Sequence, residues 1–150
     1  MSRVVLLDSG PLGLLANPRG SSETQECTLW LEELVRQGIL VKIPEIADYE
    51  VRRELLRIDK FKSIKRLDYF KMRLGYIPLT TQTMLKAAEF WAQLRKQGRP
   101  TADNKALDGD VILAAQAAVL ETQGYKVVIA TGNVNHLSRL ANAREWRHIP

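Results

Sequence analysis

Three carboxylates and one amide stand at positions that an α/β chain would bring to one end of a sheet: Asp8, Glu50, Asp110 and Asn133. Clustered carboxylates provide the oxygen ligands that a hard divalent cation such as Mg²⁺ needs. The amide of Asn133 can donate or accept a hydrogen bond, but it brings no charge. The pattern therefore predicts an acidic, metal-binding site with an uncharged fourth corner.

Each of these residues also has an ordinary structural explanation. Asp110 at the start of a helix can simply complement the helix dipole, and Asp8 after a strand can cap the next turn. Glu50 can be a solvated surface charge, and Asn133 after a glycine is typical of a turn. No single position is decisive, and the prediction depends on their joint occurrence in this order on an α/β chain.

The elements that must position these residues alternate between strands and helices. Apolar runs predict strands at 4–7, 39–43, 76–79 and 126–130, with a further edge strand at 146–149. Helical spacing predicts helices at 12–16, 21–37, 45–58, 60–74, 81–97, 109–122 and 135–140, with a polar loop at 98–105. Alternating strands and helices predict the α/β class: a three-layer α/β/α sandwich with a mostly parallel sheet of four to five strands. No repeat or linker interrupts the pattern, so residues 1–150 are expected to form a single domain.

In such sheets, binding sites form beyond the carboxyl ends of the strands. Asp8 directly follows the first predicted strand and Asn133 follows the strand at 126–130. Asp110 is expected to open the Ala-rich helix, and Glu50 lies just over one turn into the helix after the second strand. All four side chains can therefore converge at one rim of the sheet.

The composition narrows the function classes. The formal net charge is +5 and the pI is near 9.5, which favours a polyanionic partner such as nucleic acid, although an ordinary basic protein remains the alternative. Cys27 is the only cysteine and lies in an amphipathic stretch, so a buried thiol is expected, without a disulfide or a Cys-based zinc site. His136 and His148 are too few and too far apart to suggest a His-based metal site. We expect no signal peptide and no membrane span, and hence a cytoplasmic location.

Four segments together resemble the PIN domain family over nearly the whole chain: VVLLDSGPLG, ADYEVRREL, LDGDVILAAQA and VIATGNVNHLSRL. The chain is most similar to small bacterial PIN proteins, including the toxin nucleases of toxin–antitoxin pairs. This resemblance implies a PIN-like domain with the activity of a Mg²⁺- or Mn²⁺-dependent endoribonuclease. It gives Asp8, Glu50, Asp110 and Asn133 as catalytic positions, the first three of them as metal ligands, and Ser9 and Thr131 as supporting residues. Asn133 stands where many members carry a fourth Asp. Asp108 is an alternative to Asp110 as the helix carboxylate. The spacing of Asp110 to Ile112, Ala114 and Ala115 fits the family pattern and favours Asp110.

The helices after Glu50 are strongly basic. They offer candidate contacts to an RNA backbone, or simply a solvated helical face; the RNA-binding candidates are Arg52, Arg53, Arg57, Lys62, Lys65 and Arg66. The resemblance implies RNA, an antitoxin protein and a second copy of the chain as partners, and no association with a membrane is expected. The alternative is a catalytically weak or inactive PIN-like module that binds RNA or protein, and Asn133 motivates it. An Asp-phosphorylated phosphatase is disfavoured, because Gly10 stands where such an enzyme needs a second Asp.

Overall fold

Five parallel strands lie at the centre of the molecule in the order β3-β2-β1-β4-β5. The computed structural model describes residues 2–18, 20–98 and 104–150, so most of the polar loop predicted at 98–105 lies outside the described residues. The elements are β1 Arg3–Leu7, α1 Ser9–Ala16, α2 Ser22–Arg36, β2 Leu40–Pro44, α3 Glu45–Arg57, α4 Phe61–Leu74, β3 Tyr76–Ile77, α5 Thr81–Lys96, α6 Asn104–Thr122, β4 Lys126–Thr131, α7 Val134–Leu137, β5 Ala143–Glu145 and a 3₁₀ turn at Trp146–His148. The predicted α/β sandwich is confirmed, and the sheet is wholly rather than mostly parallel.

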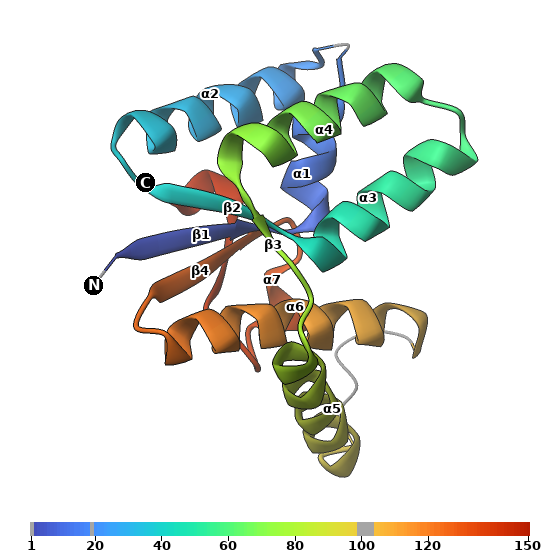
Figure 1. Cartoon of the computed structure of the whole chain (residues 1–150), viewed down its shortest axis with the longest axis vertical. Coiled ribbons are helices and arrows are strands. Elements are labelled where there is room, and N and C mark those ends of the chain that lie inside the picture. Colours follow the sequence, from blue (N-terminus) through green and yellow to red (C-terminus); the bar gives the residue numbers. More distant parts are fainter. Residues whose placement is uncertain (1, 19, 99–103) are drawn as a thin grey trace.

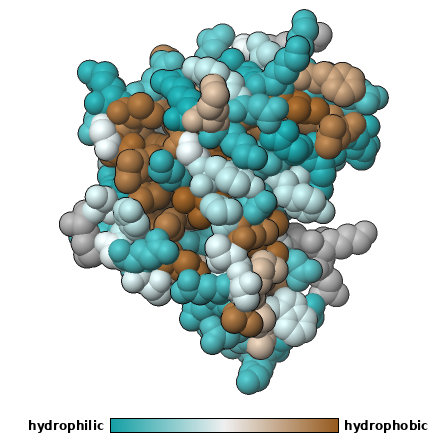
Figure 2. Space-filling view, in the orientation of Figure 1, coloured by the Kyte–Doolittle hydropathy of each residue, from teal (hydrophilic) through white to brown (hydrophobic). Residues whose placement is uncertain are grey.

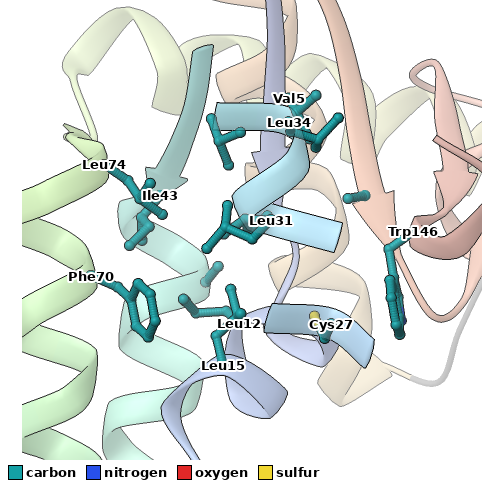
Figure 3. Packing of buried hydrophobic residues seen from close by; sticks show 14 of the residues in the cluster. Val5, Leu12, Leu15, Cys27, Leu31, Leu34, Ile43, Phe70, Leu74 and Trp146 are labelled. Carbon is teal, nitrogen blue, oxygen red and sulfur yellow. The ribbon is translucent and has the colours of Figure 1, made fainter. Parts of the chain in front are cut away.

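Helices cover both faces of this sheet (Figure 1). On one face, α1, α2, α3 and α4 bury a core that is shown in close-up in Figure 3, where Leu12, Leu31 and Phe70 meet below Val5 and Ile43. On the other face, α6 packs its apolar side against β1 and β4, and α5 packs on the outside of α6. Strands buried on both faces are continuous apolar runs, which is why they were predictable from sequence.

Three structural predictions were wrong. Residues 146–149 do not form a strand: the edge strand is β5, and Trp146–His148 form a 3₁₀ turn. Trp146 and Ile149, the residue after the turn, are both buried. Helix α6 begins at Asn104, so Asp110 lies within the helix and does not open it. Helical spacing predicts a buried face of α5 through Leu85, Ala88, Trp91 and Leu94; Leu94 is buried as predicted, but Ala87 is the other buried residue, and Leu85 and Trp91 are 65% and 40% exposed.

The other helices lie close to their predicted positions. Helix α1 begins at Ser9 rather than Leu12, because Asp8 caps it. Cys27 is buried as expected, and burial raises the pKa of its thiol to about 12. Along the described residues, no helix combines the length and the apolar character that a bilayer crossing requires.

Candidate active site

The carboxylate of Asp8 joins the ends of the two central strands. Its Oδ1 accepts a hydrogen bond from the backbone N–H of Ser9 at 2.7 Å, which caps α1. Its Oδ2 accepts a hydrogen bond from the buried hydroxyl of Thr131 at 2.7 Å. The Thr131 oxygen accepts in turn from the N–H of Asn133 at 2.9 Å. The side chain of Asp8 is therefore held in one orientation at the carboxyl end of the sheet, with Ser9 contributing its backbone rather than its hydroxyl.

Asp110 brings the second carboxylate from α6. Its side chain is 19% exposed, and its Oδ2 is buried without a hydrogen-bond partner among the described residues. Burial raises the pKa of Asp110 to about 6, His136 opposes that rise, and the charge of Asp8 adds to it. A buried carboxylate oxygen with no partner is costly to maintain, and a cation is the natural group to satisfy it.

Glu50 approaches the same place from α3. Its carboxylate packs against Gly109, the residue before Asp110: a Cβ on Gly109 would lie 2.7 Å from Glu50 Oε2. Burial raises the pKa of Glu50 above its usual range, the charges of Asp8 and Asp110 raise it further, and Arg53 opposes them. The three predicted acids therefore share one electrostatic environment, although they come from β1, α3 and α6.

The absence of a side chain at position 109 leads to a direct prediction. In Gly109→Ala, the added methyl group will displace the Glu50 carboxylate, and we expect the metal-dependent RNA cleavage that the sequence resemblance implies to fall by about 10- to 100-fold, the loss that a shift of about 1 Å in a reacting group can cause. Folding stability should stay equal or rise by up to about 1 kcal/mol, because Ala is the better helix former. Steady-state cleavage and urea unfolding measure the two effects.

Gly13→Ala is the matched control, since Gly13 also lies in a helix and a Cβ there has nothing within 4 Å. It should gain the same helix stabilisation and keep full cleavage. Equal rates for Gly109→Ala and Gly13→Ala would show that the position of Glu50 is unimportant.

The fourth corner contains one residue that sequence reasoning missed. Nδ2 of Asn133 lies 3.0 Å from Nδ1 of His136, and the same His136 nitrogen lies 3.7 Å from Oδ2 of Asp110. Asn133 therefore does not face Asp110 alone; it forms a hydrogen-bonded pair with His136 beside the acids. The three-residue spacing across α7 was visible in the sequence, but the approach of α7 to α6 was not.

The donors suit Mg²⁺ or Mn²⁺ when water completes the shell. In the described part of the chain, no group of three or more Asp, Glu, His and Cys side chains is arranged to hold a metal ion. Mg²⁺ does not require such a group, because it keeps several water ligands and often binds through one or two carboxylates. Asp8 and the unsatisfied oxygen of Asp110 match that mode, with Glu50 able to contact a bound water.

The predicted RNA-binding residues fall into two groups. Arg52 donates to both oxygens of buried Asp48 at 3.0 Å and to Asp68, Arg57 pairs with Glu54, and Arg66 donates to the carbonyl of Leu15. Their guanidinium groups thus serve contacts within the chain. Lys62 and Lys65 are exposed on α4, and Arg53 stacks over exposed Tyr49, 4.9 Å from its ring centre, next to Glu50.

Comparison with known proteins gives structural matches only. No family model matches the sequence, and no curated protein does. Among solved structures, a chain of VapBC2 from Rickettsia felis bound to a DNA fragment from their promoter matches with a TM-score of 0.71 and 18% identity, over 93% of this chain and 95% of that chain. VapBC-1 from nontypeable Haemophilus influenzae matches with a TM-score of 0.69 and 20% identity, over 96% and 98%.

DNA-bound VapBC from Salmonella typhimurium matches with a TM-score of 0.69 and 17% identity, over 97% of this chain and 99% of that chain. Coverage this complete means that the whole described architecture is shared, while identities of 17–20% limit the likeness to the fold. The parallel sheet in the order β3-β2-β1-β4-β5 and its covering helices therefore give this chain the PIN-like fold that its sequence predicts.

Proposed function

We propose that this chain is a divalent-metal-dependent endoribonuclease that acts in the cytoplasm as the toxin of a toxin–antitoxin pair. The observation that carries the proposal is the buried Oδ2 of Asp110, which has no hydrogen-bond partner among the described residues and lies in the field of Asp8 and Glu50. Carboxylates are kept buried at such an expense chiefly where they serve a function.

The residues divide the work of phosphodiester hydrolysis. A bound divalent ion would supply a nucleophilic water and neutralise the charge that develops on the phosphate. Asp8 is held for binding by its bonds from Ser9 and Thr131, and Asp110 offers its unsatisfied oxygen. We propose that Glu50, whose pKa is raised by burial, would take a proton from the attacking water at a carboxylate oxygen.

Arg53 and Tyr49 are the proposed substrate contacts nearest to this site. The guanidinium of Arg53 acts on Glu50 electrostatically, and the exposed Tyr49 ring beneath it offers a stacking surface for a base. Lys62 and Lys65 extend the positive surface along α4. Of the six basic candidates, these three cations are the ones we propose to bind an RNA backbone.

The proposal is tested by incubating the purified protein with labelled RNA in Mg²⁺, Mn²⁺ or EDTA. Cleavage with either metal and none in EDTA is the expected result. Equal cleavage under all three conditions would mean that the acids do not serve a metal.

Asn133→Asp tests the fourth corner. The added carboxylate lies beside His136 and near Asp110, so we expect tighter Mn²⁺ binding and a cleavage rate higher by about 10-fold, the effect of about 1.4 kcal/mol. Isothermal titration and cleavage assays measure both. Asn135→Asp, on the same exposed turn, is the control for added charge; equal gains in both variants would argue that position 133 is not special.

An antitoxin partner is proposed for the α3–α4 end of the molecule. Figure 2 shows hydrophobic side chains gathered there, where Leu56, Ile58 and Phe61 are 53%, 42% and 61% exposed. A cavity of about 560 Å³ opens beside them. The matched solved structures are VapBC assemblies by their descriptions, which supports a protein partner for this chain, and an exposed apolar patch is typical of such an interface.

A second candidate function is a PIN-like module that binds RNA or protein without cleaving it. The pairing of Asn133 with His136 favours it, since the fourth corner lacks a charge. Tight RNA binding with no cleavage in Mn²⁺ at high protein concentration would select this alternative. Self-association, which the family resemblance implies, would be measured by sedimentation.

A further inference from the structure

A second basic cluster lies along β1, β4 and β5, with Arg3 and Lys126 at the amino end of the sheet, opposite to the acids, and Arg144 farther along, level with Ala130. Arg3, Lys126 and Arg144 line a groove of about 230 Å³ together with Val127, Val128 and Asn142. Figure 1 shows the starts of β1 and β4 at this edge, away from the starts of α1 and α3. Strand β1 separates the two ends by about 16 Å, five residues at about 3.3 Å each.

Strand register explains why the three cations meet. Arg3 pairs with Lys126 across β1 and β4, and Arg144 pairs with Ala130 across β4 and β5. Paired residues of parallel strands point to the same face, and alternate residues of a strand share a face. Arg3, Lys126 and Arg144 therefore project from one face of the sheet, around Val128.

None of the described residues that line this groove is acidic, and no ion pair joins these three cations to a carboxylate within the described chain. Arg36 and Arg147, by contrast, both pair with glutamates. Like charges collected without a counterion destabilise a fold, and an anion in the groove would relieve that repulsion. Two guanidinium forks and an ammonium are the groups that bind phosphate oxygens most strongly.

We propose that this groove, the Arg3–Lys126–Arg144 groove, is a phosphate-binding exosite that holds the backbone of an RNA strand whose other part lies at the acids. The inference rests on the proposed function for its choice of RNA. A strand that reaches both ends gains affinity from both, whereas a strand of a few nucleotides contacts only one. The exosite thus makes the protein prefer long RNA.

The test compares the triple variant Arg3→Ser/Lys126→Ser/Arg144→Ser with Arg36→Ser/Lys86→Ser/Lys96→Ser, which loses the same charge at sites outside the groove. Binding of single-stranded RNA of about 20 nucleotides is followed by fluorescence anisotropy in EDTA at several salt concentrations. Three lost phosphate contacts, at about 0.7 each, should flatten the plot of log affinity against log salt by about 2 in slope. The control variant should keep the wild-type slope.

Thermal unfolding at low salt checks that both triple variants are folded. Arg144→Ser alone, at an exposed position, provides a milder change with an expected slope difference of about 0.7. Equal slopes for the groove and control variants would overturn the proposal. The binding of pyrophosphate to wild type and triple variant is measured as well. If the triple variant loses pyrophosphate binding while the slope of log RNA affinity against log salt is unchanged, the groove binds a free phosphate and the RNA assignment is overturned. Binding in EDTA is independent of cleavage, so an inactive protein with the predicted slopes would reject the nuclease function and leave the exosite standing.

Discussion

Asp110→Asn is expected to lower Mn²⁺-dependent RNA cleavage by about 1000-fold or more. Metal-assisted stabilisation of the reacting phosphate is worth several kcal/mol, and each 1.4 kcal/mol is about a factor of ten in rate. The substitution keeps the shape of the side chain and removes the charge at Oδ2, the oxygen that lacks a hydrogen-bond partner among the described residues. Asp8→Asn should have a similar effect. Single-turnover cleavage of labelled RNA measures both.

The same substitution should make the metal-free protein more stable, a result that a merely damaged fold would not give. The pKa of Asp110 rises from its usual 3.8 to about 6 in the folded chain, so the folded state binds the proton more tightly than the unfolded state. Stability then falls as pH rises from about 4 to about 6 and stays reduced above that. At pH 7, Asp110→Asn should recover about 1–2 kcal/mol, after allowance for solvent around the partly exposed group.

Urea unfolding in EDTA at pH 4 and pH 7 checks this effect: wild type and variant should converge at pH 4 and differ at pH 7. Adding Mn²⁺ should make the wild type more stable than Asp110→Asn at pH 7, because only the wild type is stabilised by binding the ion. Loss of stability in EDTA, together with loss of cleavage in Mn²⁺, would instead indicate that Asp110 has a structural role.

Arg52→Ala is expected to destabilise the protein by about 3 kcal/mol or more. Arg52 donates to both oxygens of Asp48, whose side chain is 9% exposed, and to Asp68 on α4. Removing one partner of a buried ion pair leaves an uncompensated charge, which typically costs 3–5 kcal/mol. The tie between α3 and α4 is lost as well. Chemical denaturation with an unchanged m-value measures the loss.

Arg53→Ala is the matched control, one residue along the same helix. Arg53 is exposed and stacks on Tyr49, so its loss should leave stability within about 0.5 kcal/mol and weaken RNA binding. The double variant Asp48→Asn/Arg52→Gln should recover part of the stability, because the buried charge is gone. If Arg52→Ala and Arg53→Ala were equally stable, the Asp48 contact would not hold the helices together.

The sequence predicts an element correctly where the local pattern of apolar residues alone determines it, and less well where contacts with other elements do. Strands such as β1 and β4 are buried on both faces, and their apolar runs were sufficient evidence. Trp146 and Ile149 stand three residues apart and are both buried, a spacing that places side chains on one side of a 3₁₀ turn but on opposite faces of a strand. Helix α6 was expected to start too late because Gly109 interrupts a helical pattern that Leu107 and Val111 continue. The absence of a side chain at Gly109 leaves room for the Glu50 carboxylate, and this contact is visible only in the folded structure.

The candidate site shows the same division. Asp8 and Asn133 follow strand ends, so their placement came from topology alone. The pairing of Asn133 with His136, the engagement of Arg52 by Asp48, and the grouping of Arg3 with Lys126 and Arg144 depend on how separate elements approach one another. Single-sequence patterns carry no information on such approaches, because any exposed basic or polar residue gives the same local signal.

The hydrogen bond between Asp8 and Thr131 joins residues that are 123 positions apart in the chain, so it can form only after Thr131 has been synthesised. During translation Asp8 leaves the ribosome well before Asp110 and Thr131, at about 5–20 residues per second. Until those residues emerge, Asp8 has neither its orienting hydroxyl nor its opposing carboxylate. The proposed nuclease site therefore cannot be complete before Thr131 has been synthesised, and an antitoxin has no complete site to meet before that point.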